Sequence, residues 1–394
     1  MERIGIYGGS FNPPHIGHMD AARSAINALN LNRLLLIPAR VAPHKAAPEG
    51  TPMPEHRLEM LRIAARSLEK AEICDLEMRR EGPSYTYETV EQLREMYPDA
   101  ELVLLMGTDM FLSFMTWNQP DRILKHVTLG VFGRGQRKEK DAIYARKAEM
   151  EAMGAKVELV GNDVIDISST QVRRMMVFRF GGFLLPKGVE TYIRENRLYG
   201  TDRDYRNLPM DELEKVAIAL HDPKRVKHVL GCRDTAAKLA KIWGVDPDVA
   251  ARAGLLHDIT KALDGPLQLT LCDEYGTILD DFSSKYPKTL HALTGSLVAE
   301  RIFGESPEVV SAIRCHTTGK ANMTTLEKII YVADYMEPNR DFPGVETLRH
   351  LAETDLDAAL KCGLEQTLNH LKNQGSRVSP ETRDALAWLN ENGY

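Results

Sequence analysis

The stretch RIGIYGGSFNPPHIGH, residues 3–18, decides the fold of the first half of the chain. Residues 3–7 form an apolar run that predicts a strand, and the glycines and prolines after it end that strand. A helix is expected to begin near Gly17. A strand, a tight Gly-Gly-Ser turn and a helix, in that order, are typical of the first unit of a parallel α/β sheet.

Apolar runs and helical patterns alternate through the rest of the first half. Several of the runs are apolar almost throughout, as expected for strands that are covered on both faces. This alternation predicts an α/β doubly wound parallel sheet, whose ligands bind at the carboxyl ends of the strands. The further predicted strands are residues 33–38, 73–78, 101–107, 127–133 and 156–160, and two clear helices are residues 55–70 and 86–97.

The pattern changes near residue 200. Residues 198–212 are polar, contain glycine and proline, and show no periodicity, so they are typical of a linker. We predict an α/β domain over residues 1–200, a linker over 201–210 and an all-α domain over 211–394. The expected helices of the last domain include residues 246–263, 294–303, 325–336 and 354–374.

Composition limits the classes of function. The formal net charge of −6 disfavours a general nucleic-acid binder, which would need a basic surface. The five cysteines lie far apart and form no CxxC pair, which favours reduced thiols and a cytoplasmic protein. Because no apolar run approaches the roughly 18 residues of a membrane span, we expect no membrane partner. Homo-oligomerisation is left open.

The turn at residues 8–10 and the two histidines after it form the first candidate site. Glycine lets the backbone turn tightly and approach a ligand, and amides in such a turn attract phosphate together with a helix N-terminus. His15 and His18 are three residues apart, so on a helix they share one face. Two imidazoles there can donate hydrogen bonds to phosphate. The alternative is a plain turn with two surface histidines.

Residues 8–18 resemble the opening motif of the HxGH nucleotidyltransferase superfamily. Further segments, in the right order, narrow the resemblance to bacterial nicotinate-nucleotide adenylyltransferases and extend it to about residue 200. Ser10 and Asn12 stand where that family often has Thr and Asp, and both keep a polar side chain. The rival is another HxGH transferase, such as a phosphopantetheine or cytidylyl enzyme. The matching segments are residues 43–45, 56–61, 81–93, 104–117, 166–173 and 184–200.

This resemblance implies that ATP and nicotinate mononucleotide react to give deamido-NAD and pyrophosphate. The nucleophile is an ionised phosphate oxygen, so catalysis is mainly positioning and electrostatic stabilisation. Mg²⁺ would accompany ATP. The implied catalytic residues are His15, His18, Lys45 and Arg173, and the implied ATP-binding residues are Gly8, Gly9, Ser10, Phe11, Gly107, Asp109, Ser169 and Thr170.

Four more residues match the mononucleotide site of that family. Trp117 is expected to stack on the pyridine ring, and Tyr85 and Thr86 to position it. Arg134 is expected to reach the mononucleotide phosphate. The alternatives are a core tryptophan and a solvated loop arginine.

A second histidine set lies in the other half. His257 and Asp258 stand side by side in an apolar segment that predicts a helix, and burying such a pair is costly unless both are engaged. The alternative is one satisfied core histidine near a helix end. Mixed imidazole and carboxylate ligands suit iron, manganese or zinc, and Asp258 could bridge two ions. The remaining candidate ligands are His228, His291, His316 and Asp334.

The order H…HD…H…H…D resembles the HD phosphohydrolase superfamily, and residues 313–349 resemble bacterial HD-domain diadenosine-tetraphosphate hydrolases. This resemblance implies symmetrical hydrolysis of a dinucleoside tetraphosphate by two transition-metal ions, with iron expected. Lys261 and Arg340 are candidates for binding phosphate, or else ordinary surface charges. The rival functions are cleavage of another nucleotide phosphoester and regulatory binding of a nucleotide without cleavage.

Overall fold

The computed structural model spans residues 1–394 and describes residues 1–41, 48, 50–133, 137–161, 165 and 167–394. The chain divides into two compact units, Met1–Arg203 and Asp204–Tyr394, and each is described by itself. Among the described residues, no helix is both long enough and apolar enough to span a membrane.

The first unit is built on a parallel sheet whose strand order is β3-β2-β1-β4-β5-β6. Ile4 of β1 pairs with Arg33 of β2 on one side and with Leu102 of β4 on the other. The strand order therefore reverses direction between β1 and β4, which is where ligands bind on such sheets. The strands are β1 (Arg3–Gly9), β2 (Arg33–Pro38), β3 (Ala71–Ile73), β4 (Glu101–Gly107), β5 (Val127–Phe132) and β6 (Val157–Val160).

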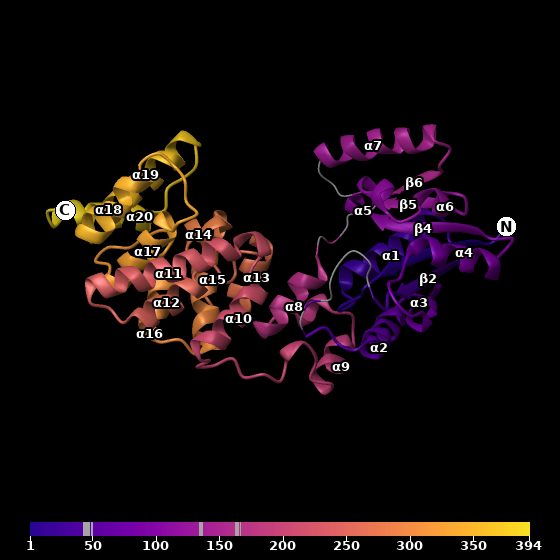
Figure 1. Ribbon diagram of the computed structural model, residues 1–394, viewed down its shortest axis with the longest axis horizontal. Coiled ribbons are helices and arrows are strands. Elements are labelled where there is room, and N and C mark those ends of the chain that lie inside the picture. The colour runs from indigo at the N-terminus through magenta and orange to yellow at the C-terminus, as the bar shows by residue number, and fades with distance from the viewer. Residues whose placement is uncertain (42–47, 49, 134–136, 162–164, 166) are drawn as a thin grey trace. The chain divides into compact units, whose positions relative to one another are not determined.

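Helices cover both faces of this sheet, which confirms the predicted doubly wound fold (Figure 1). One face carries Ile4, Ile6 and Leu104 into a core that Val90 and Phe111 of the covering helices complete. The helical segments of this unit are α1 (Ile16–Ala28), α2 (Pro54–Ala65), α3 (Leu76–Arg79), α4 (Thr86–Met96), α5 (Thr108–Leu112), η1 (Phe114–Thr116), α6 (Pro120–Leu124), α7 (Arg137–Ala152), α8 (Ser169–Val177), η2 (Gly182–Leu184), α9 (Val189–Glu195) and η3 (Leu198–Gly200).

The prediction of a strand over residues 73–78 is wrong beyond its first residue. The strand β3 ends at Ile73, and the short helix α3 begins at Leu76. The Glu77 carboxylate is buried in α3 and accepts a hydrogen bond of 2.7 Å from the Thr89 hydroxyl. This polar contact between α3 and α4 replaces the strand pairing that the apolar residues suggested.

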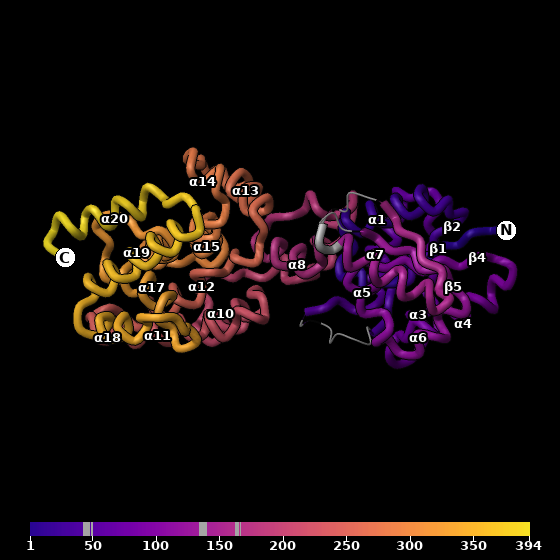
Figure 2. Tube along the Cα trace, turned by 90° about the horizontal axis from the view of Figure 1, so that it is seen from above, coloured from indigo at the N-terminus to yellow at the C-terminus, as the bar shows by residue number. Residues whose placement is uncertain are grey.

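The second unit is helical, as predicted. Helices α11 and α12 pack against each other and against α17 (Figure 2). Helices α16 and α19 also contact α17. Its segments are α10 (Met210–Leu220), η4 (Pro223–Arg225), α11 (Val226–Trp243), α12 (Pro247–Leu256), α13 (Gly265–Glu274), α14 (Asp281–Lys285), η5 (Pro287–Thr289), α15 (Leu290–Val298), η6 (Ala299–Phe303), α16 (Pro307–Cys315), α17 (Thr325–Met336), α18 (Val345–Thr354), α19 (Leu356–Asn373) and α20 (Pro380–Glu391).

The helix predicted over residues 246–263 ends early. Helix α12 stops at Leu256, so His257 and Asp258 lie at its end rather than inside it. The Thr260 hydroxyl donates a 3.0 Å hydrogen bond to the carbonyl of His291 and lies 2.8 Å from the Thr294 hydroxyl. These contacts with α15 hold the turn, which aims the His–Asp pair into the bundle.

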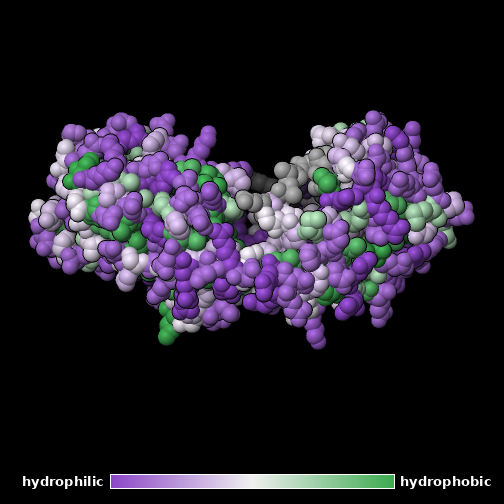
Figure 3. All heavy atoms as spheres, turned by 60° about the horizontal axis from the view of Figure 1, so that its bottom comes forward, coloured by the Kyte–Doolittle hydropathy of each residue, from purple (hydrophilic) through white to green (hydrophobic). Residues whose placement is uncertain are grey.

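Hydrophilic residues predominate on the face of the molecule that Figure 3 shows, and the hydrophobic residues on it form small separate patches. Scattered exposed apolar residues of this kind are normal for a globular surface.

Candidate active sites

A cleft of about 530 Å³ opens at the carboxyl ends of β1, β4 and β5 in the first unit. The sequence predicted a ligand site at the carboxyl ends of the strands, and the structure adds that the strand order reverses there. Of the residues predicted to act here, this cleft is lined by Ser10, His15, Gly107, His18, Ser169, Thr170 and Arg173.

The two histidines of the motif lie against each other with their ring planes tilted by 32°. Their ring centroids are 3.6 Å apart, and the backbone N–H of His15 donates to Nδ1 of His18 over 3.2 Å. A neutral His18 that accepts at Nδ1 carries its proton on Nε2, where it can donate to a ligand. A Cβ on Gly17 would stand 2.9 Å from the Ile165 carbonyl, so only glycine fits between the histidines.

The start of α8 forms a second wall of the cleft and is tied to the loop after β1. The Ser169 hydroxyl donates to the Pro13 carbonyl over 3.0 Å. The Arg173 guanidinium donates to the Asn12 carbonyl over 2.6 Å and to the Thr170 hydroxyl over 3.0 Å. A helix N-terminus and a guanidinium next to two imidazoles form a site for a phosphorylated ligand.

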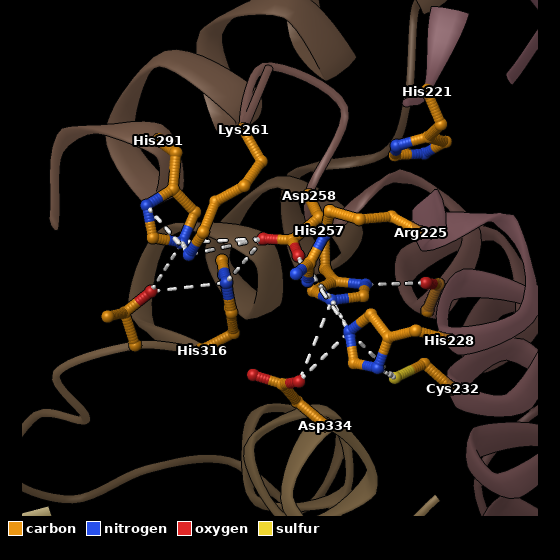
Figure 4. A network of polar contacts seen from close by, with 12 residues as sticks. His221, Arg225, His228, Cys232, His257, Asp258, Lys261, His291, His316 and Asp334 are labelled. Atoms are coloured by element: carbon orange, nitrogen blue, oxygen red, sulfur yellow. Dashed lines mark hydrogen bonds and ion pairs between the residues drawn. The ribbon is translucent and has the colours of Figure 1, made fainter. Parts of the chain in front are cut away.

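In the second unit, four histidines and two aspartates from different segments meet at one point (Figure 4). Nε2 of His228 lies 3.3 Å from Nε2 of His257 and 3.2 Å from Oδ1 of Asp334. Because bonds of about 2.1 Å to one ion place neighbouring ligand atoms about 3.0–3.5 Å apart, these distances fit a shared ion.

Asp258 faces both halves of this cluster. Its Oδ2 lies 3.7 Å from Nε2 of His228 and 3.5 Å from that of His257. Its Oδ1 lies 3.4 Å from Nε2 of His291 and 3.6 Å from that of His316. This Oδ1 is buried and accepts no hydrogen bond from any described residue. A carboxylate with two such sets of neighbours fits a bridge between two ions.

Each of the four imidazoles turns Nε2 toward the cluster and uses Nδ1 for an outer contact. Nδ1 of His257, His291 and His316 lies within 2.7–3.0 Å of a backbone carbonyl three residues earlier in the chain. Nδ1 of His228 lies 3.1 Å from Oε1 of Glu337. A proton on Nδ1 leaves a lone pair on Nε2, which is the arrangement of metal-binding histidines.

Comparison with known proteins agrees with the two sites. The family model described as Cytidylyltransferase-like matches residues 6–175, and the model described as HD domain matches residues 225–339. A protein of Carboxydothermus hydrogenoformans named "Probable nicotinate-nucleotide adenylyltransferase" is 34% identical over 198 residues, which are 50% of this chain and 98% of that protein.

A protein of Halalkalibacterium halodurans named "Bis(5'-nucleosyl)-tetraphosphatase, symmetrical" is 41% identical over 159 residues, which are 40% of this chain and 84% of that protein. The chain belongs to two families, the nicotinate-nucleotide adenylyltransferases and the HD-domain tetraphosphatases. A solved HD superfamily hydrolase from Clostridium acetobutylicum, described as involved in NAD metabolism, is 37% identical, with a TM-score of 0.46 and coverage of 47% of this chain and 98% of its own.

Several predicted residues of the adenylyltransferase unit do not line the cleft. Phe11 is fully buried beneath His18, with ring centroids 5.1 Å apart, and Asp109 is exposed in the first turn of α5. Trp117 is half-buried and packs against the core beside Phe114. Gly8 and Gly9 end β1, Tyr85 directly precedes α4, and Thr86 begins that helix. Lys45 and Arg134 lie outside the described residues.

Sequence reasoning missed two residues that shape the cleft. Arg57 is buried, and its guanidinium donates to the carbonyls of Ser10, Ala39 and Arg40 over 2.7–2.9 Å. The Tyr199 hydroxyl donates to Oδ1 of Asn12 over 2.7 Å. Neither contact has a local signal, because the partners are 47 and 187 residues apart in the chain.

The HD unit also holds residues that the sequence did not single out. The Cys232 thiol lies 3.7 Å from Nε2 of His228 and belongs to the same group of potential ligands. The Thr317 hydroxyl lies 3.2 Å from Nε2 of His291 and 3.1 Å from that of His316. Their proximity to predicted ligands in the sequence, four residues after His228 and directly after His316, was the available signal.

The two cleft histidines give the adenylyltransferase unit a predictable response to acid. Burial lowers the pKa of His18 to about 4, and burial with repulsion from His18 lowers the pKa of His15 to about 2. Unfolded histidine titrates near pH 6.5, so below that value the unfolded chain takes up protons that the folded unit excludes. The unit should therefore lose stability as the pH falls from about 6.5 toward about 4, by up to about 1.4 kcal/mol per histidine and pH unit.

Urea unfolding at several pH values tests this prediction. Trp117 reports on this unit alone once Trp243 and Trp388 are replaced by Phe in the full chain. In that background, His15→Gln with His18→Gln should flatten the dependence of the unfolding free energy on pH. An unchanged slope in the double variant would show that other groups carry the acid sensitivity.

Proposed function

We propose that the chain is a bifunctional enzyme. The domain over residues 1–200 transfers AMP from ATP to nicotinate mononucleotide, giving deamido-NAD and pyrophosphate. After a linker over residues 201–210, the domain over 211–394 hydrolyses diadenosine tetraphosphate symmetrically to two ADP. Membership of both families supports the assignment. Five free cysteines fit the reducing cytoplasm, where we place both activities.

The close histidine pair at the strand-order reversal carries the proposal for the first domain. The attacking phosphate oxygen is already ionised, so the residues need only orient the reactants and stabilise negative charge. His15 and His18 would donate to the α-phosphate, and the start of α8 with Arg173 would hold the departing pyrophosphate. Lys45 would add positive charge, and Mg²⁺ would arrive with ATP.

The position of Asp258 between two sets of imidazoles carries the proposal for the second domain. His228, His257 and Asp334 would hold one ion, and His291 and His316 the other, with Asp258 shared. The mixed nitrogen and oxygen ligands fit transition metals, and we propose iron. Bound divalent ions would supply Lewis acidity and activate the attacking water. Lys261 and Arg340 would orient the phosphate chain.

A chelation experiment on the purified full chain separates the two activities. Chelation should stop both reactions, because ATP loses Mg²⁺ and the HD cluster loses its ions. Adding back Mg²⁺ alone should restore adenylyl transfer, whereas tetraphosphate hydrolysis should return only with iron, manganese or zinc. Hydrolysis that recovers fully with Mg²⁺ alone would contradict the proposed cluster.

The substrates decide between this proposal and its rivals. Turnover of nicotinate mononucleotide, and not of phosphopantetheine, supports the first assignment. An HD domain that binds nucleotide but cleaves no tetraphosphate with any of the three metals would indicate the regulatory role instead.

A further inference from the structure

Three basic side chains surround the two carboxylates of the HD cluster. Arg225 contacts Oδ2 of Asp258, and Nζ of Lys261 lies 3.8 Å from Oδ1 of the same residue. The Arg340 guanidinium donates to Oδ1 of Asp334 over 2.6 Å. The side chains of the three cations are 33%, 37% and 40% exposed, whereas that of Asp258 is 2% exposed. Each cation therefore contacts a carboxylate of the cluster and is also partly exposed to solvent.

Arg225 is not among the site residues that the sequence predicted. The local backbone holds it in place. It ends η4, and the Asp222 side chain caps that turn by accepting from the backbone N–H of Lys224 over 2.9 Å. Helix α11 begins at the next residue and carries His228 one turn later. Figure 4 shows the guanidinium of Arg225 directed at Asp258 from this side of the cluster.

The Arg225 contact is unfavourable for metal binding taken alone. A guanidinium at Oδ2 of Asp258 repels a divalent ion that uses the same oxygen, and in a buried site this repulsion is weakly screened. In the metal-loaded cluster the ions would hold Asp258 between the two sets of imidazoles, so it would not need the Arg225 contact there. An arginine that repels the metal ion has a reason to stand here if it also binds a second anion, one that arrives from solvent.

We propose that Arg225 is a phosphate-binding residue of the HD domain, which exchanges its contact with Asp258 for a phosphate of the substrate. The inference rests on the proposed function of that domain and extends it. Guanidinium binds phosphate through paired hydrogen bonds, and the N-terminal end of α11 adds a favourable dipole at the same place. With Lys261 and Arg340, Arg225 completes three sides of a site for a chain of phosphates.

This exchange predicts that loss of Arg225 changes the affinities for metal and for nucleotide in opposite directions. Replacing Arg225 by Met removes a competitor for Oδ2, so the cluster should bind metal more tightly. The same change removes a phosphate partner, so nucleotide should bind more weakly. A residue with a purely structural role would weaken both when it is lost.

The test uses metal-stripped full chain and calorimetric titration with Mn²⁺, followed by titration of the Mn²⁺-loaded protein with ADP. We expect Arg225→Met to bind Mn²⁺ about three- to tenfold more tightly. We expect it to bind ADP about tenfold or more weakly. Arg225→Lys keeps the positive charge but loses the paired N–H donors of the guanidinium. Its Mn²⁺ affinity should therefore stay near that of the wild type, while its ADP affinity should fall.

Arg233→Met is the matched control, because Arg233 lies on α11, which follows Arg225 directly, and pairs with Glu214 and Asp234. It should change neither affinity. The proposal is overturned if Arg225→Met binds ADP as wild type does, or if its affinities for Mn²⁺ and ADP fall together. If circular dichroism shows that Arg225→Met is unfolded, the Arg225→Lys variant alone tests the proposal. An ADP affinity of Arg225→Lys equal to that of the wild type then overturns it.

Binding of ADP requires no turnover, so the two proposals can fail separately. Wild-type protein that binds ADP but cleaves no tetraphosphate contradicts the proposed hydrolysis while the comparison of variants still decides the role of Arg225.

Discussion

Asp258→Asn is expected to remove tetraphosphate hydrolysis while adenylyl transfer continues at the wild-type rate. The carboxylate lies between both imidazole sets, and an amide there has no negative charge and presents an N–H to one of them. Loss of an outer partner of a metal ligand typically costs roughly 10–100-fold. Loss of a shared ligand should cost more, about 10³-fold, and metal content should fall below one ion per chain.

Rates and elemental analysis on one preparation check this prediction. Adenylyl transfer by the same sample is an internal control for folding of the first unit. Asp281→Asn is the matched variant, since that carboxylate is exposed and pairs only with Lys285 among the described residues. An Asp258→Asn protein that keeps two ions and a tenth of the hydrolysis rate would contradict the bridging role.

His18→Ala is expected to lower kcat for adenylyl transfer by about 10²–10³-fold with little change in KM. Removal of one donor that stabilises developing charge in a transition state has costs of this size. The Nε2 proton of His18 is set by the contact from the backbone of His15 and would be lost with the ring. His18→Gln, whose amide can place an N–H near the same point, should keep part of the rate.

Steady-state kinetics with varied ATP distinguish the two roles that His18 can have. An unchanged kcat with a raised KM would assign it to binding of the ground state instead. His126→Ala is a suitable control, because His126 is not among the residues that line the cleft.

Local sequence patterns predicted much of the architecture. The strands over residues 33–38 and 101–107 begin and end where predicted, because continuous apolar runs bounded by polar residues have few alternatives when both faces are covered. The strand predicted over 73–78 was wrong beyond Ile73, because Asp75 and Glu77 interrupt the apolar run and Glu77 instead contacts Thr89. Only the folded chain brings that partner into reach.

The candidate sites divide in the same way. The histidine motif and the HD ligands were predictable because their chemistry is carried by residue type and spacing. Arg57 and Arg225 were not, since an arginine is usually a surface charge and only distant partners make these two distinctive. The structure brings the six predicted HD ligands together, whereas Trp117 and Asp109 remain outside the lining of the first cleft and keep the status of predictions.

Three of the four imidazoles in the HD cluster are oriented by main-chain carbonyls, and His228 alone is oriented by a carboxylate, that of Glu337. A substitution changes a side chain and leaves the backbone carbonyl in place, so the contacts that orient these three ligands do not depend on which side chains surround them. Of these four orienting contacts, only the one from Glu337 can therefore be removed by a substitution. Replacing Glu337 is the direct way to release one imidazole of the cluster without changing any ligand.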